Sequence, residues 1–396
     1  MWRFSASSLP LFAYFLLIPA GLAETNVVLP FANLAKDQAL DWVGESICEN
    51  IADALSAEGL LVLDREDRCE VYRRMSLRQY ALLTRATVIK VGEALDADHV
   101  IFGQFSVSGG EPSDKRSIRL AARVLDLTRL RQSVEFSQTA PLEDLASLQV
   151  NLAWEAYRYL RPQTARSEAG FKTSRQATRV DAMENYIRGL VAATEEQRHR
   201  LFTQAARLDP NYSQPRFQLG RWHWERKNYQ VAADWLKQVA ASDPHYRAAT
   251  FLLGLSRYQL GDYAGAEEAF AGVAKQIPLN EVFNNLGAAQ ARRDRPEALD
   301  SFRKALEGDE SDPVYHFNVG YALWRQGEFD RAADSFRAVL DRNSGDAEAT
   351  FMLGRCLKRT RARSLETRAE PGPRLKQDFN ETAYLQLKEM LESKKQ

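Results

Sequence analysis

The side chains that could carry out covalent or metal chemistry are few and scattered in this sequence. The chain of 396 residues has five histidines and three cysteines, and it contains no G-x-S-x-G, P-loop, H-E-x-x-H or paired C-x-x-C motif. A hydrolase needs a nucleophile next to a base, and a metal site needs several ligands close together. We therefore expect a non-catalytic protein with no cofactor and no bound metal ion.

One histidine, His223, lies between two tryptophans, Trp222 and Trp224. Aromatic rings beside an imidazole could form a cage for a ligand. The same residues, however, fall within a helical pattern that recurs along the chain, and a fold framework position does not by itself indicate a function. We therefore expect His223 to be a structural histidine.

The three cysteines allow at most one disulfide. Cys48 and Cys69 lie 21 residues apart in the N-terminal region, and an oxidising compartment would allow them to pair. A bridge also requires Cα atoms within about 7 Å of each other, which the sequence does not decide. The pairing stays open, whereas Cys356 is expected to be a buried thiol.

The overall charge limits the class of partner. Lys and Arg together number 53, as do Asp and Glu, so the formal net charge is zero. Domains that bind nucleic acid usually carry a net positive charge. We therefore expect no nucleic-acid partner.

Residues 1–23 have the pattern of a secretory signal peptide. Arg3 precedes an apolar run at 11–18, and small residues near position 23 offer a cleavage site. The apolar stretch is shorter than the roughly 20 residues that span a bilayer. We expect an exported protein, periplasmic or secreted, that starts near Glu24 and meets the membrane only through this peptide. An uncleaved anchor is the alternative.

Residues 24–162 alternate short apolar runs with patterns of helical period. Short runs predict buried strands, and apolar residues three or four apart predict helices. Strands are expected at 26–31, 60–63, 99–103, 117–128 and 132–139, and helices at 43–59, 84–95 and 142–160. This order predicts an α/β domain, with a polar linker at 163–180 after it.

Several short motifs of this region are similar to one family. Residues 28–34 read Val-Leu-Pro-Phe-Ala-Asn-Leu, residues 97–103 read Ala-Asp-His-Val-Ile-Phe-Gly, and residues 123–126 read Arg-Val-Leu-Asp. In this order they resemble the TolB N-terminal-like domain. The resemblance covers nearly all of residues 26–140 and implies the α/β fold of that family, which often precedes helical repeats.

A second region is organised by one recurring pattern. Glycines preceded by an aliphatic residue are 34, 33, 33 and 34 residues apart, at positions 220, 254, 287, 320 and 354. Alanines at 232, 266, 298 and 332 follow them in phase, and a large apolar residue comes four positions after each alanine. A glycine on one helix and an alanine on the next let two helices approach closely. The period predicts helix pairs that must stack to build a shared core.

The small and large residues of this pattern resemble the tetratricopeptide repeat. Four repeats are clear at 213–246, 247–279, 280–312 and 313–346, a shorter one fits 182–212, and a sixth begins at Ala347. The resemblance implies an all-α solenoid over 181–360 whose concave face binds a protein or peptide. Its usual arrangement implies that this face is lined by Phe217, Arg221, Trp224, Phe251, Leu255, Tyr258, Asn284, Phe317, Tyr321, Trp324, Phe351 and Arg355.

The C-terminal residues 361–396 combine a basic stretch with a last helical pattern. Cations surround Pro371-Gly372-Pro373, and such a run either serves as a solvated connector or suits an acidic partner. Apolar residues within 379–392 predict an amphipathic helix that could cap the array. We expect a connector followed by a capping helix.

These features together predict an α/β domain followed by a tetratricopeptide solenoid. The expected function is that of an exported, non-catalytic adaptor that binds a protein partner on the concave face. The alternative is a sensor, in which the α/β domain binds a small molecule or an envelope fragment and the repeats relay the signal.

Overall fold

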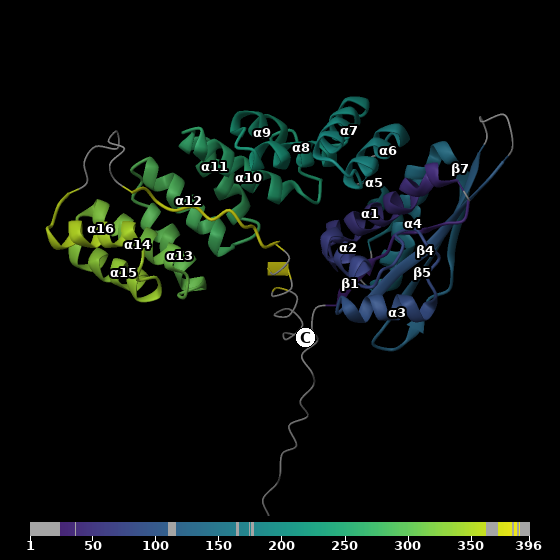
Figure 1. Ribbon diagram of the computed structural model, residues 1–396, viewed down its shortest axis with the longest axis horizontal. Helices are drawn as coiled ribbons and strands as arrows, with labels where there is room; N and C mark the ends of the chain where they lie inside the picture. Colours follow the sequence, from purple (N-terminus) through teal and green to yellow (C-terminus); the bar gives the residue numbers. More distant parts are fainter. Residues whose placement is uncertain are drawn as a thin grey trace, which may run out of the picture.

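The computed structural model describes residues 24–388 except for 36, 110–115, 164–165, 174, 176–177, 362–370, 382–383 and 386–387. The predicted signal peptide at 1–23 lies outside the described residues. Figure 1 shows a sheet domain at one end of the molecule and a row of helix pairs at the other. Among the described helices, none is both long enough and apolar enough to cross a bilayer.

The N-terminal domain is built on one mixed sheet with the order β3-β1-β4-β5-β6. In it β1 runs parallel to β3 and β4, and β4 pairs antiparallel with β5 from His99–Asp126 to Ser108–Ser117. Two further strands extend it, since β2 pairs with β4 and β7 with β5. The strands are β1 Thr25–Val28, β2 Ala32–Asn33, β3 Leu61–Val62, β4 His99–Ser108, β5 Ser117–Asp126, β6 Arg131–Gln132 and β7 Phe136–Pro141.

Helices cover both faces of this sheet, so its central strands are apolar on both sides. Val28 and Ile101 face α1 (Asp41–Ala57) and α4 (Leu145–Leu160), within one apolar cluster. Val27 and Val100 face α2 (Arg65–Arg74) and α3 (Arg85–Ala94), within another. The predicted α/β fold is confirmed.

Helix α2 is one element that sequence periodicity did not predict. Its ten residues are mostly charged, and only Arg68, Val71 and Tyr72 are buried. Its start follows from a cap, because the side chain of Asp64 accepts a hydrogen bond from the backbone N–H of Asp67 at 2.9 Å.

The stretch expected to be a linker, 163–180, contains a short helix, α5 (Glu168–Thr173). Phe171 is fully buried, and its ring lies 5.5 Å from that of Trp154 and 5.4 Å from that of Tyr157. The prediction of a polar linker is therefore wrong for residues 168–173, because the side chain of Phe171 joins the N-terminal core.

The remaining helices form the predicted array of antiparallel pairs. Each pair has a first helix, A, and a second helix, B. The pairs are α6 (Val180–Leu190) with α7 (Glu195–Leu208), α8 (Ser213–Glu225) with α9 (Tyr229–Leu236), α10 (Tyr246–Gln259) with α11 (Tyr263–Ala274), α12 (Asn280–Arg292) with α13 (Ala298–Gly308), and α14 (Pro313–Gln326) with α15 (Phe329–Arg342). A further A helix, α16 (Ala347–Leu357), follows.

The close approach within each pair has the cause that the spacing suggested. A Cβ atom on Gly254 would lie 2.7 Å from the ring of Phe270, and one on Gly287 would lie 2.7 Å from the ring of Phe302. The glycine of helix A therefore receives the aromatic ring of helix B. Any larger residue at these glycines would push the pair apart.

The two parts of the molecule share one hydrophobic core. The cluster that contains α1 and α4 continues through Met183 and Ile187 on α6 to Phe202 on α7. A buried polar chain crosses the same boundary, where Gln149 donates to Ser46 Oγ at 2.8 Å and Ser46 Oγ contacts the sulfur of Met183 at 2.8 Å. The first repeat is therefore packed directly on the sheet domain.

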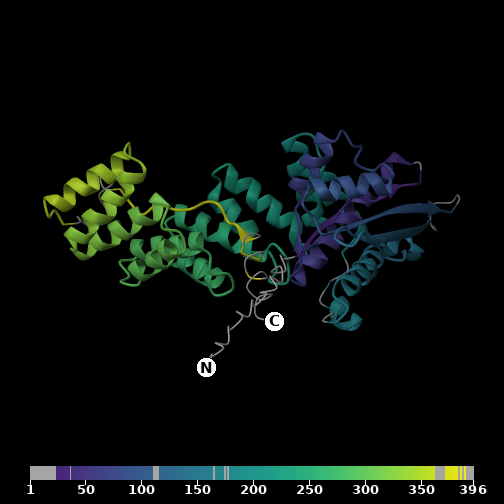
Figure 2. The same cartoon turned by 90° about the horizontal axis from the view of Figure 1, so that it is seen from below.

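After α16 the described chain resumes at residue 371 and runs back along the array. Figures 1 and 2 show this extended yellow stretch crossing α12 toward α10. We call residues 371–381 the tail segment. The expectation of a solvated connector is wrong for these residues, because they contact four helices of the array, as described below. The predicted capping helix at 379–392 lies largely outside the described residues.

Candidate functional site

Three asparagines form a polar row on the A helices of the array. Asn284 and Asn285 lie on α12 and Asn318 lies on α14, and all three are 0 % exposed. Asn285 and Asn318 hold the same place in successive repeats, two residues before the glycines at 287 and 320. Buried amides need hydrogen-bond partners, and these find them outside their own helices.

The partners are backbone groups of the tail segment. Asn318 accepts from the N–H of Arg374 at 2.7 Å and donates to its carbonyl oxygen at 2.7 Å. Asn285 accepts from the N–H of Lys376 at 2.8 Å and donates to its carbonyl oxygen at 2.8 Å. Asn284 is a second donor to the carbonyl oxygen of Arg374, at 2.9 Å. The two amides thus pair with alternate residues, as a neighbouring β-strand would.

The side chain of Arg374 lies in an acidic corner. Its guanidinium pairs with Asp346 at 2.7 Å and with Glu348 at 2.8 Å, and it lies 3.7 Å from the ring centroid of Phe317. The hydrogen bonds from Arg374 lower the pKa of Asp346 below its usual value. Burial opposes the charge of Arg374, but these two carboxylates outweigh burial and raise its pKa. A bidentate, partly buried pair of this kind is stronger than an exposed one.

The rest of the tail segment alternates apolar and charged contacts. Leu375 packs between the two apolar clusters of the array's second half, and the ring of Phe379 stacks on Phe251 with centroids 4.9 Å apart. Lys376 forms an ion pair with Asp312, and Glu381 forms one with Arg247. We call the surface of α10, α12, α14 and α16 that holds these contacts the A-helix face.

Several residues predicted from the sequence lie on this face. Phe251, Asn284 and Phe317 contact the tail segment directly. Leu255 and Tyr258 belong to the apolar clusters against which Leu375 packs. These five therefore lie together on the A-helix face, and their role in binding a partner stays a prediction.

The side chains of Tyr321 and Trp324 are buried, whereas a side chain that anchors a partner must be accessible before the partner binds. They are 3 % and 1 % exposed, and the indole N–H of Trp324 donates to the carbonyl of Thr360 at 2.9 Å. Arg355 lies over the same indole, 5.0 Å from its centroid, whereas Phe351 on α16 remains 46 % exposed. These four residues lie on α14 and α16, the last two A helices of the array.

Of the predicted residues of the first clear repeat, Phe217 and Arg221 contact residues outside the tail segment, whereas Trp224 packs against the same apolar cluster as Leu375 and Phe379. Phe217 stacks on His245 with ring centroids 4.7 Å apart, and Arg221 pairs with Glu225 on its own helix. Trp224 packs, half-buried, against the clusters of α8 and α10. The structure therefore does not join Phe217 and Arg221 to the site around Arg374.

Other contact residues were missed by sequence reasoning. They are Asn285, Asn318, Asp312, Asp346 and Glu348, together with the tail segment itself. One signal was present, because an asparagine recurs on a buried helix position in two successive repeats. Two cations of the basic C-terminal run, Arg374 and Lys376, pair with carboxylates of this chain's own array.

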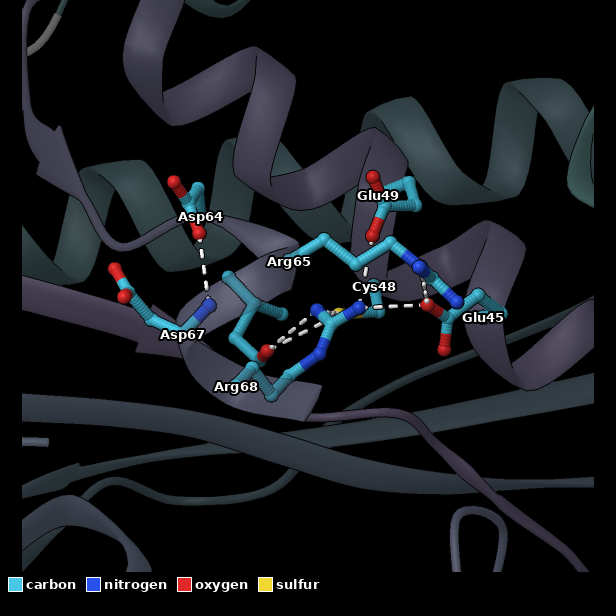
Figure 3. A network of polar contacts seen from close by, with 8 residues as sticks. Glu45, Cys48, Glu49, Asp64, Arg65, Asp67 and Arg68 are labelled. Atoms are coloured by element: carbon cyan, nitrogen blue, oxygen red, sulfur yellow. Dashed lines mark hydrogen bonds and ion pairs between the residues drawn. The ribbon is translucent and has the colours of Figure 1, made fainter. Parts of the chain in front are cut away.

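Figure 3 shows a second polar cluster, which ties α2 to α1. Arg68 pairs with Glu45 at 2.6 Å and with Glu49 at 2.8 Å, and it donates to the carbonyl of Val28 at 3.1 Å. It also contacts the thiol of Cys48, whose pKa burial raises well above its usual value. A neutral, buried thiol is a poor nucleophile, so the cluster is structural.

The remaining residues with possible chemistry are the three cysteines and His223. Cys48, Cys69 and Cys356 are free thiols, so the disulfide left open by the sequence is not formed. His223 contacts the ring of Trp222 edge-on, and burial lowers the pKa of its imidazole. Within the described residues, no three His, Cys, Asp or Glu side chains are grouped to hold a metal ion.

A family model for the tetratricopeptide repeat matches the helical part of this chain. Within residues 199–362 the helical array contains tetratricopeptide repeats. The matched ranges are 199–246, 217–281, 287–347 and 320–362. They begin after the sheet domain, so its resemblance to the TolB N-terminal-like domain stays a prediction. A search of curated proteins finds no match.

Several solved structures are similar to part of the chain. YrrB, described as a TPR protein with an unusual peptide-binding site, is 20 % identical, with 49 % of this chain and 92 % of that one covered and a TM-score of 0.36. MamA from Desulfovibrio magneticus RS-1 is 22 % identical over 43 % of this chain and 99 % of its own, with a TM-score of 0.39. Pseudomonas aeruginosa pilF is 19 % identical over 41 % and 75 %, with a TM-score of 0.36.

Proposed function

We propose that this protein is a non-catalytic adaptor whose repeat array binds an extended segment of a partner protein on the A-helix face. The observation that carries the proposal is the pairing of Asn285 and Asn318 with the backbone of an extended chain. Side-chain amides that bind backbone groups can bind segments of many different sequences. The asparagine row could therefore also bind an extended segment of another protein.

The neighbouring side chains would then select among such segments. Phe251 and Phe317 offer aromatic surfaces, and Asp312, Asp346 and Glu348 offer negative charge beside them. Buried aromatic anchors give most of the affinity of an interface, and complementary charge gives specificity.

Photo-crosslinking of the full chain to its partner tests this proposal. Replacing Asn285 and Asn318 together with alanine should abolish crosslinks from the A-helix face while leaving the helical circular dichroism intact. Asn343→Ala is the matched control, since this asparagine is exposed near the end of α15. Equal crosslinking by all three proteins would contradict a role of the asparagine row in binding.

We further propose that the protein is exported, on the pattern of Arg3 and the apolar run at residues 11–18. The mature chain should start near Glu24. Mass spectrometry of the protein from its native cell tests this, and an intact Met1 in the cytosol would contradict it.

The sensor function is the second candidate. A hollow on the sheet domain is lined by Pro30, Phe102, Gln104, Arg123 and Glu135, among others. Arg123 and Glu135 pair there at 2.7 Å, which gives the hollow a polar rim beside an apolar wall. A thermal shift of the full chain with nucleotides, sugars or envelope fragments should appear if the hollow binds a ligand. A shift unchanged by Arg123→Ala would exclude this hollow.

A further inference from the structure

The tail segment has the burial pattern of a bound peptide and not that of a core element. Of residues 371–381 only Pro373 is buried, and Gln377, Asp378 and Asn380 are exposed. The aromatic rings that fill the helix pairs, such as Phe270 and Phe336, come from the repeats themselves. The tail segment therefore lies on an array that the repeats have already built.

Its contacts are of a kind that another chain could reproduce. Five hydrogen bonds join the three asparagines to the backbone of Arg374 and Lys376. Further contacts are ion pairs, the stacking of Phe379 on Phe251, the contact of Arg374 with the ring of Phe317, the apolar packing of Leu375 and the hydrogen bond from the N–H of Asn380 to Glu281. None of these contacts requires the two partners to be covalently connected.

We propose that the tail segment is an intramolecular competitor, which occupies the A-helix face until a partner segment of similar chemistry displaces it. This inference rests on the proposed function and adds its regulation and the chemistry of the partner. The resting protein is closed by its own residues 371–381. The partner-bound protein has them released.

The occupied positions specify the partner segment. An arginine fits between Asp346 and Glu348 on the ring of Phe317. A lysine two residues later fits at Asp312, and an aromatic ring three residues after that fits on Phe251. The partner is therefore an extended protein segment of the form Arg-x-Lys-x-x-aromatic. A segment with an acidic residue at the Arg or the Lys position would be rejected, because its carboxylate would lie against the carboxylates of the A-helix face.

The covalent connection gives the tail segment an advantage that can be estimated. A short tether typically holds its ligand at an effective concentration of about 1 mM. If the untethered segment bound with a Kd of about 10 μM, an external peptide would bind about 100-fold more weakly to the closed chain than to an open one. Competition of this size is readily measured.

The experiment uses the full chain and a fluorescent peptide with the sequence of residues 371–381. The double variant Arg374→Glu, Phe379→Ala keeps every residue of the A-helix face and removes the contacts that two side chains of the tail segment make with it. The wild type should bind the peptide weakly, and the variant should bind it at least tenfold more tightly. Gln377→Ala, a change at an exposed position of the tail segment, should behave as the wild type.

Hydrogen exchange at the N–H groups of residues 374 and 376 verifies that the variant has released its tail segment. If the double variant fails to fold, Arg374→Glu alone carries the same test. Equally tight binding to the wild type and the released variant would overturn the competitor role but leave the binding face intact. No binding to a verified released variant would overturn both this inference and the proposed function.

Light scattering distinguishes a tail segment bound within its own chain from one exchanged with a second copy. The mass of the wild type should equal that of one chain at all concentrations. A mass that rises with concentration in the wild type, but not in the released variant, would overturn the intramolecular form.

Discussion

At the scale of single residues, the protein joins distant parts of its chain through side-chain amides. Asn318 pairs with both backbone groups of Arg374, 56 residues further along the sequence. The recurrence of asparagine at one register could have marked the row in advance. The segment that pairs with this row could not be predicted, because the asparagines bind backbone groups, and nearly every residue type carries the same backbone groups.

His245 offers a residue-scale prediction about pH. Its ring stacks on Phe217 at the start of α10, and its Nδ1 lies 3.3 Å from a carboxylate oxygen of Asp243. Burial lowers its pKa, but the hydrogen bond to Asp243 and the charges of Asp53, Asp243 and Glu49 raise it to about 9. Since the folded pKa exceeds the unfolded one, the imidazolium stabilises the fold fully below pH 6.5 and ceases to do so as the pH rises through about 9.

The measurement is the melting temperature of the wild type and His245→Gln between pH 5.5 and about 10. The difference between the two should be largest at the acidic end and should shrink through pH 9. A difference in melting temperature that stays constant with pH would show that the charge of His245 does not stabilise the fold. An NMR titration of the ring gives the pKa directly.

At the scale of elements, the repeat spacing determined most of the helices correctly. Glycine, alanine and aromatic positions recur because each pair needs the same close contact, so the pattern identifies the elements. Helix α2 escaped detection because only three of its ten residues are buried. The strands β6 and β7 were predicted as one strand, because residues 133–135 between them carry no turn signal.

A pair of glycine substitutions tests the reason given for the spacing. Gly254→Ala should destabilise the array by about 1–3 kcal/mol, because its Cβ would lie 2.7 Å from the ring of Phe270. Gly354→Ala is the matched control, since no described atom lies within 4 Å of its added Cβ. That change should be neutral or stabilising by up to about 1 kcal/mol, since alanine favours a helix.

Urea unfolding of the two variants and the wild type measures these differences. Equal midpoints for Gly254→Ala and the wild type would contradict the close packing of α10 on α11. A large loss in Gly354→Ala would contradict the open environment of α16.

At the scale of the whole molecule, the sheet domain and the array are less separate than their sequences imply. Composition and periodicity change near residue 163, which predicts two domains with a linker. The structure instead places Phe171, Met183 and Ile187 in the core of the sheet domain. The sequence does not predict this junction. The apolar residues on either side of it could equally well be buried within the sheet domain alone or within the array alone.

Ile187→Ala tests this shared core. The side chain is 1 % exposed on α6, so its truncation should cost about 2–5 kcal/mol. Hydrogen exchange should accelerate on α1 and α4 as well as on α6. Val339→Ala, on α15 in the cluster at the other end of the array, is the control and should leave α1 and α4 unchanged. Faster exchange confined to the repeats in Ile187→Ala would contradict a common core.

The central claim is that the array recognises the backbone of an extended segment. It is tested most directly by N-methylated peptides of residues 371–381 bound to the chain with its tail segment released. Methylation at Lys376 removes the N–H that Asn285 accepts at 2.8 Å and should weaken binding about tenfold or more. Methylation at Gln377, whose N–H makes no hydrogen bond within the described residues, should leave the affinity unchanged. Equal affinities of the two peptides would contradict backbone recognition.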